Sequence, residues 1–299
     1  MYSQITANKR RTWVLMFVFA ALILLIGFAY DQVLGHGAGY GGFAFACVLT
    51  LGMTATSYFA GDRIALWTSG ARPVEKRDAP QLYRIVENLA ITAGMQTPKV
   101  YVISDSAINA FATGRDPKHA SIAVTSGTMD QLTNEELEGV IAHELSHVQN
   151  YDTRIMTIVV VLVGVIALLS DWLLRARFFR GGRSDRREDG NLGAIMLVLG
   201  IVVAIIAPIV AQLIKLAVSR QREYLADASG ALLTRYPEGL ARALEKIAAA
   251  NQPLLRANTA TAHLYIANPV GTRGQRFANL FSTHPPIGDR IRILRRMGI

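Results

Sequence analysis

The chain has 299 residues, 51% of them hydrophobic, and its mean hydropathy of +0.28 is high for a soluble protein. The formal net charge of +9 would suit a nucleic-acid-binding protein, but many of the basic residues flank apolar segments, so we expect no nucleic-acid partner. The only cysteine, Cys47, excludes an internal disulfide. The composition therefore favours a membrane protein.

Four apolar segments hold most of the excess hydrophobicity. They are residues 13–29, 42–60, 155–174 and 192–213. Each has about the ~17–25 residues that a helix needs to cross a hydrocarbon core, and soluble helices rarely stay apolar on every side for this length. The first segment is too long for a signal peptide and no A-x-A site ends it, so we expect an uncleaved anchor.

These segments predict an integral membrane protein with two transmembrane helical hairpins. The N-terminal hairpin covers residues 1–61, and the second covers residues 154–218. Between and after them lie the polar residues 62–153 and 219–299, which we expect to form the two parts of one domain.

Basic residues indicate the orientation of the first hairpin. Lys9, Arg10 and Arg11 precede it, no Lys or Arg lies between residues 30 and 40, and Arg63 and further basic residues follow it. The positive-inside rule then places the N-terminus and residues 62–153 in the cytoplasm. Residues 175–191, which connect the two segments of the second hairpin, would then lie on the far side of the membrane. Their six arginines contradict the positive-inside rule there. Either the first hairpin sets the topology, which we favour, or the second enters the bilayer without crossing it.

Two strands and a capped helix are predicted in the first polar part. "TPKVYVISD" (97–105) and "ASIAVTSG" (120–127) are β-branched and roughly alternate in polarity. Thr133 followed by Glu136 is the pattern of a capping box at a helix start. We expect a fold that is mainly α with a small β-sheet (α+β), in which "SIAVTS" (121–126) is an edge strand to which an extended substrate adds.

The predicted helix carries "IAHELSH" (141–147), the pattern of a zinc peptidase. His143 and His147 are four residues apart, so both imidazoles lie on one helical face and can reach one Zn²⁺. Glu144 stands beside the first ligand, where it can act as general base. We therefore predict one catalytic Zn²⁺.

A catalytic zinc site needs a third protein ligand. Candidates are Glu223, Asp152, His119, His263 and His284. Glu223 and Asp227 are four residues apart in "SRQREYLADASG", which suggests Glu223 on the metal and Asp227 as a hydrogen-bond partner of a ligating histidine. A solvated acidic pair on a helix is the alternative, and Asp152 is expected to end a helix or to support a ligand.

Four motifs together resemble the HtpX-like membrane zinc metalloproteases, relatives of the CAAX prenyl proteases. They are "IAHELSHVQNYD", "SRQREYLAD", "NAFATG" (109–114) and "THPPIGDRI" (283–291). The resemblance implies a zincin-type catalytic domain with His143, His147 and Glu223 as zinc ligands and Glu144 as general base.

The resemblance also implies two further roles. Asn109, Ala110 and Phe111 look like the segment that hydrogen-bonds the substrate backbone in this class, although an ordinary loop before a strand is the alternative. His284 resembles a histidine that steadies the oxyanion, with Arg290 as its partner. The alternative for His284 is a surface histidine before a Pro-Pro break.

The sequence therefore predicts a membrane-embedded zinc endopeptidase of the bacterial inner membrane, with its active site facing the cytoplasm. We expect membrane-protein or unfolded polypeptide substrates, and the resemblance adds a role in quality control under stress. The alternatives are a processing protease for lipid-modified, CAAX-type peptides and a catalytically silent, zinc-stabilised scaffold. The oligomeric state is not predicted.

Overall fold

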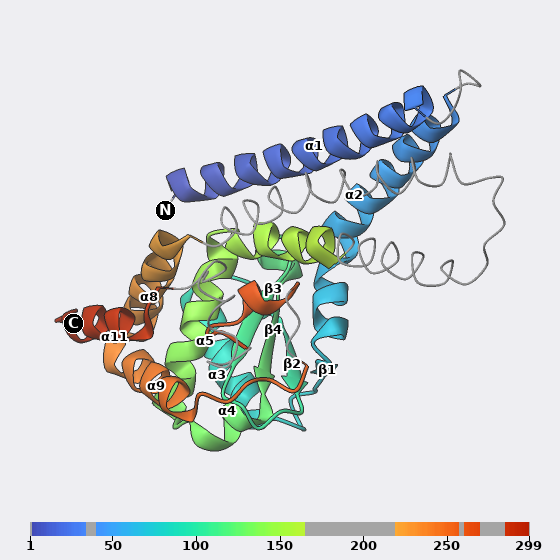
Figure 1. The fold of residues 1–299 in the computed structure, drawn as a ribbon. Helices are drawn as coiled ribbons and strands as arrows, with labels where there is room; N and C mark the ends of the chain where they lie inside the picture. Colours follow the sequence, from blue (N-terminus) through green and yellow to red (C-terminus); the bar gives the residue numbers. More distant parts are fainter. Residues whose placement is uncertain (1, 34–39, 165–218, 257–259, 270–284, 299) are drawn as a thin grey trace.

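The structure, a computed structural model, describes residues 2–33, 40–164, 219–256, 260–269 and 285–298. Two long helices begin the chain, α1 (Tyr2–Val33) and α2 (Gly41–Thr68), and they contain the expected segments 13–29 and 42–60. Figure 1 shows α2 rising from the sheet to meet the end of α1. Within the described residues, α2 is the one helix long and apolar enough to cross a membrane.

A glycine and an acid fix the contact between α1 and α2. A Cβ on Gly27 would lie 2.4 Å from the Cβ of Ala46, so only glycine allows this approach. At the start of α2, the carboxylate of Asp31 accepts hydrogen bonds from the backbone N–H groups of Gly42 (2.8 Å) and Phe43 (2.7 Å). These groups have no partner within the helix, so Asp31 stabilises its N-terminus.

The second predicted hairpin lies mostly outside the described residues. Residues 152–164 are helical, and this helix packs on α1 through a small apolar cluster. The buried members of the cluster are Leu15, Met16, Phe19, Ile155, Ile158, Val159 and Leu162. The start of the third apolar segment therefore contacts the first. The expected span 192–213 is not among the described residues.

A small mixed sheet has the strand order β1-β2-β4-β3. The strands are β1 (Arg72–Pro73), β2 (Lys99–Ile103), β3 (Ala110–Thr113) and β4 (Ser121–Thr125). β2 and β4 are parallel, whereas β1 and β3 pair antiparallel with β2 and β4 respectively. The two predicted strands, within 97–105 and 120–127, are confirmed.

The expectation that "SIAVTS" is an edge strand is wrong. Its residues form β4, which pairs with β2 on one side and β3 on the other, and all five of its residues are buried. A β-branched strand buried on both faces fits an inner position. The edge strand next to β4 is β3, which contains Ala110 and Phe111 of the predicted substrate-binding segment.

Helices surround the sheet, and α5 (Asn134–Gln149) lies at their centre. The other labelled helices after α2 are α3 (Pro80–Thr92), α4 (Ser126–Gln131), α8 (Arg220–Thr234), α9 (Pro237–Ala250) and α11 (Ile287–Arg295). Figure 1 shows the sheet on one side of α5. On the other side of α5 lie α8, α9 and α11. The predicted capping box is confirmed, with Glu136 accepting from the N–H of Thr133 at 2.8 Å. The described chain is mostly helical with a small mixed sheet, as predicted.

Candidate metal centre

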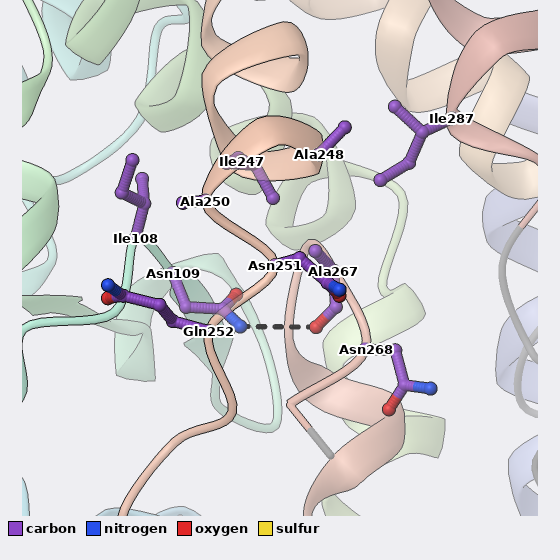
Figure 2. Close-up of a pocket in the computed structure, with 10 residues that line it drawn as sticks. All are labelled: Ile108, Asn109, Ile247, Ala248, Ala250, Asn251, Gln252, Ala267, Asn268 and Ile287. Carbon is purple, nitrogen blue, oxygen red and sulfur yellow. Dashed lines mark hydrogen bonds between the residues drawn. The ribbon is translucent and has the colours of Figure 1, made fainter. Parts of the chain in front are cut away.

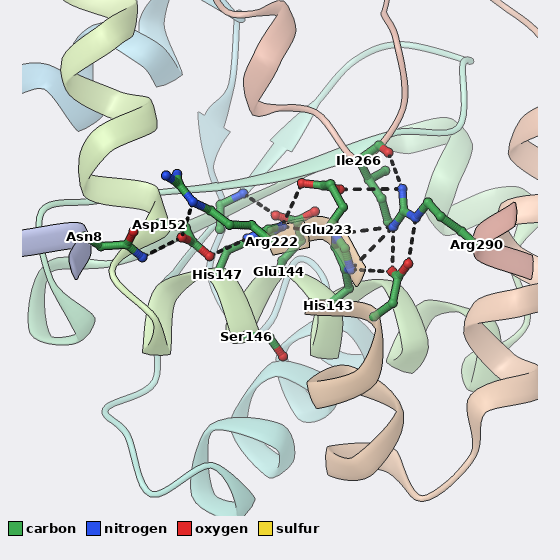
Figure 3. A network of polar contacts seen from close by, with 12 residues as sticks. Asn8, His143, Glu144, Ser146, His147, Asp152, Arg222, Glu223, Ile266 and Arg290 are labelled. Atoms are coloured by element: carbon green, nitrogen blue, oxygen red, sulfur yellow. Dashed lines mark hydrogen bonds and ion pairs between the residues drawn. The ribbon is translucent and has the colours of Figure 1, made fainter. Parts of the chain in front are cut away.

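Two helices bring together three side chains of the kinds that ligate metal ions. α5 carries His143 and His147, and α8 carries Glu223. The two Nε2 atoms lie 3.2 Å apart, and the Glu223 carboxylate is 3.7 Å from His143 Nε2 and 3.5 Å from His147 Nε2. One donor atom from each residue lies within 4.8 Å of the others, and all three side chains are buried. Figure 3 shows them converging from the two helices.

A glycine allows α8 to approach α5 closely enough for this. A Cβ on Gly230 would lie 2.9 Å from the backbone N of His143 and 3.2 Å from the carbonyl carbon of Ala142. Such contacts are too short for any larger residue without movement of one helix. Gly230 therefore helps to set the separation between Glu223 and the two histidines.

Each histidine is held at its outer nitrogen by a buried acid. His143 Nδ1 lies 2.9 Å from Asp227 Oδ1, and His147 Nδ1 lies 3.1 Å from Asp152 Oδ2. When Nδ1 donates to a carboxylate, Nε2 carries the lone pair that a metal binds. The contact of Asp227 agrees with its predicted role, and Asp152 supports the other histidine. Both Nε2 atoms consequently face Glu223.

The acids around His147 raise its affinity for protons. Burial disfavours the imidazolium, but the hydrogen bond with Asp152 and the charges of Glu223 and Glu144 outweigh burial and raise the pKa of His147 to about 9. Burial lowers the pKa of His143 despite its contact with Asp227. Because metals bind neutral imidazole, protons and a metal compete for this site.

Glu144 links the donors to the sheet edge. Its side chain is only 2% exposed, and its Oε2 accepts a hydrogen bond of 2.8 Å from the backbone N–H of Ala112 on β3. Burial, with a further contribution from the charge of Glu223, raises the pKa of Glu144 to about 8. A carboxyl group with a pKa near neutrality suits proton transfer in either direction.

Arg290 of α11 completes the network around His143. It donates to both oxygens of Asp227, from Nε (2.8 Å) and Nη2 (2.7 Å), and its Nη1 donates to the carbonyl of Ile266 at 3.1 Å. Although burial opposes ionisation of both groups, their mutual attraction raises the pKa of Arg290 and holds the pKa of Asp227 well below its usual value. Arg290 is fully buried and its Nη1 is 3.7 Å from Glu223. Its predicted partner, His284, lies outside the described residues.

The charges of this buried cluster favour a divalent cation. Its described carboxylates are Glu144, Asp152, Glu223 and Asp227, and its guanidinium groups are Arg222 and Arg290. With the acids ionised and the histidines neutral, as metal binding requires, four negative and two positive charges leave a net charge of −2; without a metal, protons on Glu144 and His147 neutralise it. Unbalanced buried charge is costly, and a metal ion is one of the few groups that offset it. The donor set therefore fits Zn²⁺.

The remaining candidates lie elsewhere. His119 is 49% exposed and its Nδ1 contacts Asp116 at 2.7 Å, and His263 Nε2 lies 2.9 Å from the carbonyl oxygen of Met156. Among the described residues, His143, His147 and Glu223 are the one cluster of this kind.

Asn8 contributes to the hydrogen bonds around the site, and the sequence did not predict this role. Its Nδ2 donates to Asp152 Oδ1 at 2.7 Å and to the carbonyl of Asn150 at 2.8 Å, so α1 contacts the acid that holds His147 (Figure 3). In the sequence Asn8 is only a polar residue before a basic run, and no local pattern pairs it with a residue 144 positions away.

The predicted substrate segment lies beside the site. Asn109 is 4% exposed, and its Nδ2 donates to the carbonyl of Ala267 at 3.1 Å. The same side chain lines a pocket of about 340 Å³ between the end of α9 and the segment around Ala267 (Figure 2). Apolar groups such as Ile247 and Ile287 line it together with neutral amides. The pocket offers room for an uncharged side chain.

Sequence comparison decides the family. The profile of peptidase family M48 matches residues 76–298, which include all the residues of the α5 and α8 cluster. The chain belongs to peptidase family M48. The M48 chain is 49% identical to a protease HtpX homolog of Dictyoglomus thermophilum, over 99% of this chain and 95% of that protein. It is 48% identical to a protease HtpX homolog of Tropheryma whipplei strain Twist, over 100% and 99% of the two chains.

A solved structure shares the fold. The crystal structure of S. mikatae Ste24p is 16% identical and has a TM-score of 0.51, over 98% of this chain and 67% of that one. The family match and the HtpX homologues show that the M48 chain is a metalloprotease, so a catalytically silent scaffold is no longer an alternative.

Proposed function

We propose that the chain is a membrane-embedded zinc endopeptidase in which His143, His147 and Glu223 hold one Zn²⁺ and Glu144 is the general base. The observation that carries the proposal is the joint position of three converging donors and a buried carboxylate hydrogen-bonded to an edge strand. A structural zinc site usually has four protein ligands and needs no base.

A bound Zn²⁺ would supply Lewis acidity, which lowers the pKa of water and polarises a carbonyl. The chain's own groups would do the rest. Glu144 accepts a proton from water and delivers it to the leaving amine, while the N–H of Ala112 holds its carboxylate in place. Asp227, which Arg290 holds in place, accepts a hydrogen bond from His143 and so keeps the proton of that imidazole on Nδ1.

Substrate binding is assigned to the sheet edge. Asn109, Ala110 and Phe111 would bind the backbone of an extended peptide along β3, in place of the β4 segment expected from the sequence. Backbone recognition demands little of the substrate sequence, which suits cleavage of misfolded proteins. His284 is kept as an oxyanion donor on the resemblance alone, and Arg290 is assigned to hold Asp227.

The chain would lie in the bacterial inner membrane, crossing it several times, with residues 62–153 and 219–299 forming one cytoplasmic catalytic domain. The HtpX homologues and the apolar helix α2 support a membrane protein. At the end of α2, Trp67 is 80% exposed, and an indole ring there would suit the membrane interface. β1 begins four residues after α2 ends, so the catalytic part would lie near the bilayer surface. Loops and ends of membrane proteins are therefore the proposed substrates, in a quality-control role.

Metal removal tests the proposed activity. Purified protein in detergent should cleave β-casein, an unfolded protein, and lose this activity when 1,10-phenanthroline removes its metal. One equivalent of Zn²⁺ should restore cleavage, whereas Mg²⁺ should not, because nitrogen ligands favour zinc over magnesium. Cleavage that persists after elemental analysis shows the metal to be gone would contradict the proposal.

A further inference from the structure

The outer edge of β3 already has hydrogen-bond partners within the chain. Backbone groups of alternate residues in an antiparallel strand point to opposite sides. The carbonyl of Asn109 accepts from Thr125 at 3.0 Å, on the β4 side, so the groups of Ala110 and Ala112 point outward. Ala112 donates its N–H to Glu144, and the carbonyl of Ala110 accepts from the N–H of Ile266 at 3.0 Å.

Ile266 belongs to residues 260–269, here named the strap. Three groups around the proposed substrate edge bind its backbone. They are Ala110 O with Ile266 N (3.0 Å), Asn109 Nδ2 with Ala267 O (3.1 Å), and Arg290 Nη1 with Ile266 O (3.1 Å). Every one of these bonds is made to a main-chain group of the strap. An extended peptide of any sequence offers the same N–H and C=O groups.

Side chains fix the strap on this edge. Tyr265 and Ile266 are only 1% and 2% exposed. The ring of Tyr265 packs edge-on against Phe111 of β3, with centroids 5.0 Å apart and an interplanar angle of 70°. Next to it, His263 contacts the carbonyl of Met156 at 2.9 Å. The strap is thus a packed element of the structure.

We propose that the strap is an autoinhibitory contact: its residues 265–267 occupy the place of an extended substrate and must move before a peptide can bind β3. This rests on the proposed function, because it assumes that Asn109 and Ala110 bind substrate. Ala112, two residues along the same strand, is bonded to the proposed base, so the strap lies beside the reacting groups. Ala267 and Asn268 also line the pocket of Figure 2, so displacement of the strap would widen that pocket.

Two substitutions should release the strap without touching the catalytic groups. Ile266→Pro removes the N–H that bonds to Ala110, and Tyr265 already has φ −72° and ψ 147°, the conformation favoured before proline. Tyr265→Ala instead removes the packing on Phe111. Ile266→Val, which keeps the N–H and most of the packing, is the matched control.

We expect kcat/KM for β-casein to rise by roughly fivefold in Ile266→Pro, mainly through a lower KM, since one hydrogen bond contributes about 1 kcal/mol. Tyr265→Ala, which removes the ring contact with Phe111, should raise it by at least as much. The control should match the wild type, and zinc content should not change. If both release variants hold full zinc and cleave β-casein no faster than Ile266→Val, the strap is structural and the proposal is overturned.

Hydrogen–deuterium exchange tests the same idea without altering the strap. In zinc-loaded Glu144→Gln protein, which should bind β-casein without cleaving it, bound casein should accelerate exchange of the 265–268 amides by about tenfold or more. Amides of β4 serve as the internal reference. Unchanged or slower exchange in the strap, with casein shown to be bound, would overturn the strap proposal alone. Failure of the wild-type enzyme to cleave casein would overturn the proposed function and the strap proposal together.

Discussion

Replacing Glu144 by Gln should lower kcat for β-casein by about 10²–10⁴-fold, the range that a positioned acid–base group contributes. The amide cannot accept a proton from water, but it keeps the volume of the side chain and an oxygen for the N–H of Ala112. Burial raises the pKa of Glu144 to about 8, so this buried position already favours an uncharged side chain and should tolerate a neutral amide. We therefore expect bound zinc to be retained and the thermal midpoint to stay the same or rise.

Glu138→Gln is the matched control, because Glu138 lies on the same helix and is partly exposed. It should leave kcat, zinc content and thermal midpoint unchanged. Initial rates on β-casein, together with elemental analysis and a thermal melt in detergent, measure all three quantities. A Glu144→Gln enzyme with wild-type kcat would show that another group accepts the proton.

Replacing Arg290 by Met should destabilise the protein by about 3–5 kcal/mol, the cost of leaving one partner of a buried ion pair uncompensated. Arg290 and Asp227 are both buried and share two hydrogen bonds of 2.7 and 2.8 Å. Without Arg290, Asp227 is free to move or to take a proton, and His143 loses the acid that orients it. We therefore also expect zinc affinity to fall by about 10–100-fold.

A double variant separates stability from metal binding. In Arg290→Met with Asp227→Leu, both charges are gone, so much of the stability should return. Zinc affinity should stay low, because His143 still has no carboxylate at Nδ1. On the same helix, Arg292→Met breaks only an exposed pair with Asp289 and should change stability by about 0–1 kcal/mol. Equal zinc affinity in the double variant and the wild type would refute the role assigned to Asp227.

Local patterns predicted the core of the site. The capping box at Thr133 fixed the start of α5, and spacing along that helix placed His143 and His147 on one face. The second pair of residues, the acids Glu223 and Asp227, was predicted in the same way, because these residues are also four apart on a helix. These features depend on residues three or four apart, for which helix geometry is known in advance.

Contacts between distant segments were not predictable in the same way. Asp152 reaches His147 because the chain turns at Tyr151, which has a positive φ of 60° that is uncommon for a residue other than glycine. The order of the strands was also missed, since "NAFATG" is too short and alanine-rich to read as a strand. The strap on β3 depends on a pairing across more than 150 residues and has no local signal. Most of the second hairpin (165–218) and the role of His284 fall on residues that the structure does not describe, so both stay predictions.

Bound zinc tests the central claim most directly. Elemental analysis of the purified protein should find one Zn²⁺ per wild-type chain and much less than one in Glu223→Ala. A catalytic zinc site needs three protein ligands, and two histidines alone hold the ion weakly. Glu245→Ala, which removes an exposed acid of α9 that pairs with Arg295, should keep one. One Zn²⁺ per chain in Glu223→Ala would contradict the proposed site and point to a different third ligand.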